Sequence, residues 1–92
     1  MRTIERTTAF KRDFKREAKG RHRAVLDTDL RQIITALATD QPLEPRHRDH
    51  ALSSNWNGYR DCHLRPDLVL IYRLDPERLI LARLGSHSEL DL

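Results

Sequence analysis

Seven consecutive residues, Leu68 to Leu74, do most to limit the folds open to this chain. The run reads Leu-Val-Leu-Ile-Tyr-Arg-Leu, and only one of its residues carries a charge. A nearly continuous run of aliphatic, β-branched and aromatic residues is typical of a strand that is covered on both faces. We therefore expect a central strand here, with other strands on either side of it.

The segments before and after this run read as two further strands joined by tight turns. Residues 59–65 alternate between the two faces of a strand, and Pro66-Asp67 ends that strand in a turn. Residues 75–78, Asp-Pro-Glu-Arg, form the next turn, and 79–84 is the third strand. The sequence thus predicts a three-stranded meander.

Four polar side chains fall at the margins of this meander, in strand ends or adjoining loops. Taken singly, each has an ordinary structural role, as a hydrogen-bonded histidine, a turn residue or a surface side chain. Because the ends of neighbouring strands lie close together, the four can converge on one site: His63, Asp67, Arg83 and His87. Cys62 points to the face opposite His63, where we expect a small buried core residue.

The first part of the chain predicts a short strand followed by a helix. Residues 1–6 form the strand, and Thr7 or Thr8 caps a helix that runs from about Ala9 to Lys19. Apolar residues at i, i+4 and i+8 are expected to form its buried stripe: Phe10, Phe14 and Ala18. Gly20 ends the helix.

A second amphipathic helix follows, from His22 or Arg23 to Ala38. Its apolar residues recur at spacings of three and four, which marks one buried face: Val25, Leu26, Leu30, Ile33, Ile34 and Leu37. Pro42 and Pro45 then require a loop. We predict a single α+β domain over residues 1–92, in the order β-α-α-β-β-β, with a helical hairpin packed on a mainly antiparallel sheet.

No stretch of the chain reads as a membrane span or a secretory leader. No apolar run approaches the ~18 residues of a span, and we expect a cytoplasmic protein. A single cysteine cannot form an internal disulfide. The spacing of His47, His50, Cys62 and His63 matches no common zinc site, so we expect no metal and no cofactor.

Positive charge is concentrated at the start of the chain. Residues 1–24 hold nine Lys or Arg against three acids, whereas residues 25–45 hold one Arg against four acids. An Arg-rich face suits a phosphate backbone, because guanidinium groups bind phosphate oxygens bidentately. A solvated helix surface accounts for the same charges equally well.

Several polar anchors occur in an order that resembles a known toxin family. These are Asp49-His50, then Trp56 to His63, then Pro66 to Tyr72, then Gly85-Ser-His87. Together they resemble the YafQ branch of the RelE/ParE superfamily, the toxins of type II toxin-antitoxin modules. The similarity covers nearly the whole chain and is most specific from His50 to His87.

The resemblance implies a ribosome-dependent mRNA endonuclease that cuts message in the A site. It implies catalysis by His50, His63, Asp67 and His87, with Arg83 at the place of a phosphate-contacting arginine. It also implies a cognate antitoxin, typically in a heterotetramer, and contact with 16S rRNA through the first helix, by Lys11, Arg12, Lys15, Arg16 and Lys19. Two positions depart from the usual aromatic residues, Leu68 and Asp91. The loss of the aromatic residue near the last strand, at Asp91, puts base stacking and hence codon preference in doubt, but it does not remove the acid-base residues.

The chemistry can be argued from the residues themselves. RNA is cut without a metal when its 2′-hydroxyl attacks the adjacent phosphate, giving a 2′,3′-cyclic phosphate and a 5′-hydroxyl end. Imidazole can act as the base or the acid near neutral pH. We expect His87 to be the general acid, His50 or Asp67 to be the base, and His63 to contact phosphate or share in proton transfer.

Two other functions remain open at the level of the sequence. A ParE-like poison of gyrase would share the fold but lacks this set of histidines. A degenerate toxin would keep antitoxin binding without cleavage, and only Leu68 and Asp91 favour it. Trp56 and Tyr59 are expected to pack within the protein rather than stack on bases, and Tyr72 is expected in the core.

Overall fold

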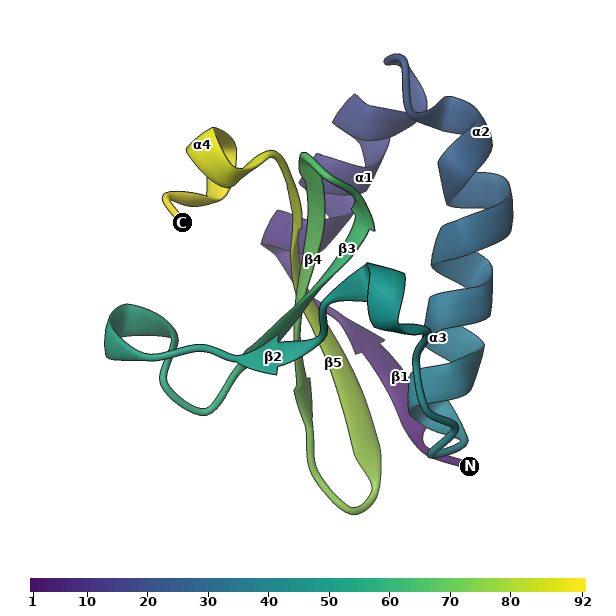
Figure 1. Cartoon of the computed structure of the whole chain (residues 1–92), viewed down its shortest axis with the longest axis vertical. Coiled ribbons are helices and arrows are strands. Elements are labelled where there is room, and N and C mark those ends of the chain that lie inside the picture. The colour runs from purple at the N-terminus through teal and green to yellow at the C-terminus, as the bar shows by residue number, and fades with distance from the viewer.

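The computed structural model describes residues 1–92, which form one five-stranded sheet with the long helices on one side (Figure 1). The strands lie in the order β1-β5-β4-β3-β2. Their bounds are Thr3–Arg6 (β1), His50–Ala51 (β2), Arg60–Arg65 (β3), Leu68–Leu74 (β4) and Arg78–Gly85 (β5). Only β1 and β5 pair in parallel, so the prediction of a mainly antiparallel α+β fold is confirmed.

The two predicted helices are present with small changes. Helix α1 spans Thr8–Ala18, and the Thr7 hydroxyl caps it by accepting the Phe10 N–H at 3.0 Å. The second helix is one helical segment made of α2 (Arg23–Val25), the π-helical turn η1 (Leu26–Leu30) and α3 (Arg31–Ala38). The π turn was not predicted, because the apolar spacing of three and four does not distinguish it from an α-helix.

Several short elements also escaped the sequence analysis. They are β2, two 3₁₀ turns, η2 (Pro45–His47) and η3 (Ser54–Trp56), and the single-turn helix α4 (His87–Leu90). A strand of two residues, such as β2, is too short to show an alternating pattern in the sequence. Helix α4, by contrast, has a recognisable start signal, a capping box in which Ser86 accepts the Glu89 N–H and the Glu89 carboxylate accepts the Ser86 N–H.

The main core lies between the helices and the sheet. Its members from α1 to α3 include Phe10, Leu30 and Ile33, and those from the sheet include Leu70, Tyr72 and Leu81. A smaller cluster on the opposite face contains Val69, Ile71, Ala82 and Leu90, with Trp56 and Tyr59 packed against it. Strand β4 is therefore covered on both faces, as its composition predicted. The buried positions of Cys62 and Tyr72 are confirmed too.

The predicted stripe of α1 was wrong at one position. Phe14 is 37% exposed, and the inward position beside Phe10 is taken by Asp13, which is completely buried. The reason is that α1 lies along the edge of β5, where side chains meet backbone groups. The backbone groups at this edge need hydrogen-bonding side chains, which an apolar stripe cannot supply.

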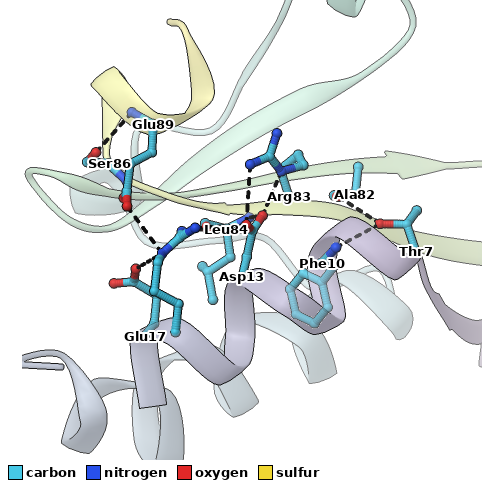
Figure 2. A network of polar contacts seen from close by, with 10 residues as sticks. Thr7, Phe10, Asp13, Glu17, Ala82, Arg83, Leu84, Ser86 and Glu89 are labelled. Atoms are coloured by element: carbon cyan, nitrogen blue, oxygen red, sulfur yellow. Dashed lines mark hydrogen bonds and ion pairs between the residues drawn. The ribbon is translucent and has the colours of Figure 1, made fainter. Parts of the chain in front are cut away.

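Side chains of α1 and of its N-cap residue Thr7 form hydrogen bonds with the edge of β5 beyond the point where β1 ends (Figure 2). The Thr7 hydroxyl donates to the Ala82 carbonyl at 2.8 Å, and Asp13 accepts the Leu84 N–H at 3.1 Å. Arg16 donates to the Leu84 carbonyl at 2.9 Å. The helix thus replaces a missing neighbouring strand at the C-terminal half of β5.

Candidate active site

Three histidines from three different elements form a row beside the smaller core. His50 lies on β2, His63 on β3, and His87 is the first residue of α4. Ring centroids are 6.5 Å apart between His50 and His63, and 5.2 Å apart between His63 and His87. The sheet register explains this grouping, because β2 pairs with β3 and the row His63, Val69, Gly85 ends two residues before His87.

His87 is oriented by the turn between β3 and β4. Oδ1 of Asp67 accepts hydrogen bonds from the His87 backbone N–H at 3.1 Å and from its ring Nδ1 at 2.9 Å. These hydrogen bonds lower the pKa of the Asp67 carboxyl, so it is ionised at neutral pH. The remaining ring nitrogen of His87, Nε2, lies 3.2 Å from Nε2 of His63 and is the one left for proton transfer.

His50 is held by its own loop. Its Nδ1 lies 2.9 Å from the carbonyl oxygen of Arg48, which can only accept, so Nδ1 carries the hydrogen. The same nitrogen is 3.0 Å from Oδ1 of Asp61, but the N–H is directed at the carbonyl. Neutral His50 therefore presents Nε2 as a basic nitrogen.

Asp61 is a member of this site that the sequence analysis did not select. Its side chain is buried, with the residue only 3% exposed, and Oδ1 has no hydrogen-bond partner. Burial raises the pKa of the Asp61 carboxyl, and the charges of His50, His63 and His87, when protonated, offset part of that rise. The strand alternation that puts Asp61 on the face of His63 was the signal that could have identified it.

Arg83 lies apart from the histidine row. Its guanidinium binds the buried carboxylate of Asp13 through Nε at 2.6 Å and Nη2 at 3.3 Å (Figure 2). In the sheet register it is separated from Asp61 by one residue, Ile71 of β4. Its third nitrogen, Nη1, makes no hydrogen bond within the protein and can still donate to a ligand.

The five basic residues predicted to contact rRNA are all exposed, but one of them is held by the protein itself. Arg16 contacts the carboxylates of Asp13, Glu17 and Glu89 as well as the Leu84 carbonyl. The other four form no ion pair and leave their charges free: Lys11, Arg12, Lys15 and Lys19.

The positions that depart from the family pattern differ in their surroundings. Leu68 is completely buried in the main core, whereas Asp91 is exposed and ends α4 with a left-handed backbone, φ 59°. No three His, Cys, Asp or Glu side chains are arranged to hold a metal ion. None of the helices has the length and hydropathy that crossing a membrane requires.

Comparison with known proteins identifies the family of this chain. Residues 2–92 match the family described as a bacterial toxin of type II toxin-antitoxin system, YafQ. The chain belongs to the YafQ toxin family. The mRNA interferase toxin YafQ of Escherichia coli BL21-DE3 is 39% identical over 90 residues, which cover 97% of this chain and 95% of that toxin.

Solved structures of YafQ toxins share the fold over nearly their whole length. The crystal structure of YafQ from E. coli BL21(DE3) is 36% identical, with a TM-score of 0.85 and 98% of each chain covered. YafQ in the E. coli DinJ-YafQ complex is 35% identical, with a TM-score of 0.82 over 98% of each chain. The similarity inferred from the anchors around His50 to His87 is thereby confirmed.

Proposed function

We propose that this YafQ toxin is a ribosome-dependent mRNA endonuclease whose histidine row performs the cleavage. The observation that carries the proposal is the environment of the two ring nitrogens of His87. One of its ring nitrogens is bound to an ionised carboxylate and the other faces His63. The bond to Asp67 fixes the orientation of the ring, so Nε2 is the nitrogen from which His87 would give a proton to the leaving oxygen. The relatives named mRNA interferases support the same chemistry.

The reaction is a transfer of the phosphoryl group within the RNA strand. His50, through Nε2, takes the proton of the 2′-hydroxyl as its oxygen attacks phosphorus. The bond from phosphorus to the 5′-oxygen breaks, and His87 gives that oxygen a proton. The products are a 2′,3′-cyclic phosphate and a 5′-hydroxyl end.

Geometry favours His50 over Asp67 as the base. Asp67 already accepts two hydrogen bonds from His87 and therefore acts as its positioning residue. His50 is exposed and has a free Nε2.

The remaining residues of the site stabilise charge. His63 lies between the proposed acid and base, and we assign it to the phosphate. Arg83 is the second candidate, through its free Nη1, while its ion pair with Asp13 keeps the guanidinium in place. Asp61 places a buried carboxyl group beside the proposed base, with Oδ1 3.0 Å from Nδ1 of His50.

Two macromolecular partners belong to the proposal. We expect the ribosome to contact α1 through Lys11, Arg12, Lys15 and Lys19, with a smaller part for Arg16. We also expect a cognate antitoxin in a heterotetramer, as E. coli YafQ is found in complex with DinJ. We further propose a cytoplasmic location, where both partners would be met.

The deciding experiment is inducible expression of the wild type and of His87→Ala, with mapping of message ends in arrested cells. Cuts within translated codons that leave 5′-hydroxyl ends, absent from the variant, are the expected result. His22→Ala is the matched control, since this histidine lies at the start of α2, outside the row. Growth arrest with intact message would contradict the nuclease and indicate a gyrase poison. Neither arrest nor cleavage from a folded protein would indicate a binding module.

The ribosome contact has its own test. Charge reversal at Lys11, Arg12 and Lys15 should weaken association with ribosomes at physiological salt, because each lost phosphate contact reduces counterion release. Unchanged association of a folded variant would show that this face of α1 is a solvated surface only.

A further inference from the structure

A cleft of about 500 Å³ opens beside the pair of His63 and His87. Its wall contains three arginines, Arg46, Arg48 and Arg65, and a further histidine, His47; Leu64 is its single hydrophobic residue. The cleft shares His63 and His87 with the proposed catalytic row but contains none of its carboxylates. A concave surface of this composition suits an anion.

The three arginines differ in whether a carboxylate of the protein already pairs with their charge. Arg65 forms a 2.6 Å ion pair with the mostly buried side chain of Asp29, and Arg46 forms a 3.0 Å pair with the exposed Glu44. Arg48 has no carboxylate partner, so the positive charge of this wall that remains uncompensated is centred on Arg48. Arg46 adds to it, because an ion pair between two exposed side chains is readily exchanged for another partner.

His47 fixes these arginines relative to the catalytic row. The residue is only 5% exposed, and its Nδ1 donates to the His63 carbonyl oxygen at 2.7 Å. This bond joins the η2 turn to β3, so the arginines on either side of His47 are held next to His63. The hydrogen bond therefore fixes the backbone from which both arginine side chains extend.

Arg48 also has an unusual backbone. Its φ is 47° and its ψ is 46°, the left-handed region that a side chain other than Gly, Asn or Asp seldom adopts. In this conformation its N–H bonds the Pro45 carbonyl at 3.1 Å and its own carbonyl accepts from His50. The left-handed residue ends the η2 turn and reverses the chain toward His50, so the free guanidinium of Arg48 starts from a backbone position fixed between His47 and the proposed base.

We propose that this cleft binds the RNA phosphodiester next to the scissile one, with Arg48 as its main contact and Arg46 as a second. The inference rests on the proposed function, since it takes the strand cut by the histidine row as its ligand. An RNA strand that lies across His63 and His87 must continue past them in both directions. The cleft borders one of those directions and offers a guanidinium to the negative charge that arrives there.

The test is a double-mutant cycle between Arg48 and the charge of one linkage. Ribosomes are programmed with one of two altered messages. One message has an uncharged methylphosphonate at the linkage before the scissile one, and the other has it at the linkage after the scissile one. The control message for each has the ordinary phosphodiester at that linkage. Each altered message and its control carry a 2′-methoxy group on the nucleotide 5′ of the altered linkage and keep the free 2′-hydroxyl at the cleavage site. The protein variant is Arg48→Asn, because Asn tolerates the left-handed backbone and so preserves the turn. Arg31→Gln, an exposed arginine of α3, is the matched control.

At one of the two linkages, we expect removal of the charge to raise KM about tenfold for the wild type and to change little for Arg48→Asn. Arg48→Asn alone should raise KM about as much on the control message, with kcat nearly unchanged, and should lower the slope of log affinity against log salt by about 0.7. Arg31→Gln should behave as the wild type.

Independent effects of Arg48→Asn and of the neutral linkages, at both positions, would overturn the inference while leaving the nuclease intact. Weaker antitoxin binding by Arg48→Asn, with unchanged cleavage kinetics, would also overturn it and assign the cleft to carboxylates of the antitoxin. Absence of cleavage by the wild type on the control message would instead contradict the proposed function itself.

Discussion

Two buried aspartates on this small domain have opposite surroundings. Asp13 accepts hydrogen bonds from Arg83, Arg16 and the Leu84 N–H, so its carboxylate is fully paired. Asp61, at 3% exposure, has an oxygen with no hydrogen-bond partner. Burial alone raises the pKa of either carboxyl, but at Asp13 the hydrogen bonds outweigh it and the pKa is lowered, whereas at Asp61 it is raised.

The difference suits two separate roles, stability for Asp13 and the proposed chemistry for Asp61. A buried carboxylate with complete partners holds two elements together, here α1 and β5. A buried carboxylate with incomplete hydrogen bonds lowers the stability of the fold. Such groups occur mainly at functional sites, where their charge acts on neighbouring residues. Burial of a charged residue therefore does not reveal its role until its partners are counted.

Replacement of Asp13 should have the largest effect on stability. Asp13→Ala leaves Arg83 without its carboxylate and the Leu84 N–H without an acceptor, which should lower the free energy of unfolding by about 4 kcal/mol. Urea unfolding followed by circular dichroism measures it. A loss below about 1 kcal/mol would show that the pairing around Asp13 is replaceable by water.

Replacement of Asp61 should affect activity and spare stability. Asp61→Asn removes the negative charge beside the three histidines, and we expect the rate of message cleavage to fall about a hundredfold. The free energy of unfolding should stay within about 1 kcal/mol of the wild type or rise, since the cost of burying a charge disappears. Single-turnover cleavage and urea unfolding of the same sample separate the two effects. Full activity in Asp61→Asn would make this aspartate a structural residue like Asp13.

Arg83 binds Asp13 and is separated from Asp61 by a single residue of β4, so its replacement should affect both stability and the proposed reaction. Arg83→Lys keeps the charge but loses the bidentate pairing, so we expect about 1.5 kcal/mol less stability and about tenfold lower kcat. A drop in stability with unchanged kcat would limit Arg83 to supporting Asp13.

The smallest effects should appear in the dependence of stability on pH. The lowered pKa of Asp13 stabilises the fold above the usual value of 3.8, and this contribution is lost as the pH falls through the folded-state pKa. Asp61 has the opposite sign: above 3.8 the unfolded carboxyl ionises before the folded one, so stability falls as the pH rises.

Urea unfolding from pH 3 to pH 7 should therefore separate the two variants. For the wild type, ionisation of Asp13 should raise the free energy of unfolding as the pH rises from 3, and Asp13→Asn should lack this increase. Asp61→Asn should become more stable relative to the wild type as the pH rises above about 4. Parallel curves for the three proteins would contradict both assignments.

Much of this fold was predictable because its signals are local. The apolar run of β4, the alternation of β3 and the periodicity of the second helix each specify one element and its buried face. Phe14 and Asp13 show where such reasoning fails. The pattern of α1 contains an apolar residue that lies outside and an acid that lies inside, because the helix meets a strand edge, and nothing within α1 encodes that edge.

The site was predictable to the extent that its residues follow one another along neighbouring strands. His63 and His87 were expected to converge, and they do, within 3.2 Å. Asp61 was missed because an acid on a short strand usually faces water. Its neighbours are supplied by the sheet, where it pairs with His50 of β2 and Ile71 of β4, and a strand as short as β2 leaves no pattern in the sequence.

The polar seam between α1 and β5 has a consequence for the whole toxin. One side of α1 carries the basic residues proposed to contact rRNA, and its other side binds the backbone of the strand that leads directly into His87. In the proposed function, recognition of the ribosome and placement of the proton donor therefore share a single helix. A substitution that shifts α1 is expected to alter both together, so the proposed docking surface and the proposed catalytic site form one mechanical unit.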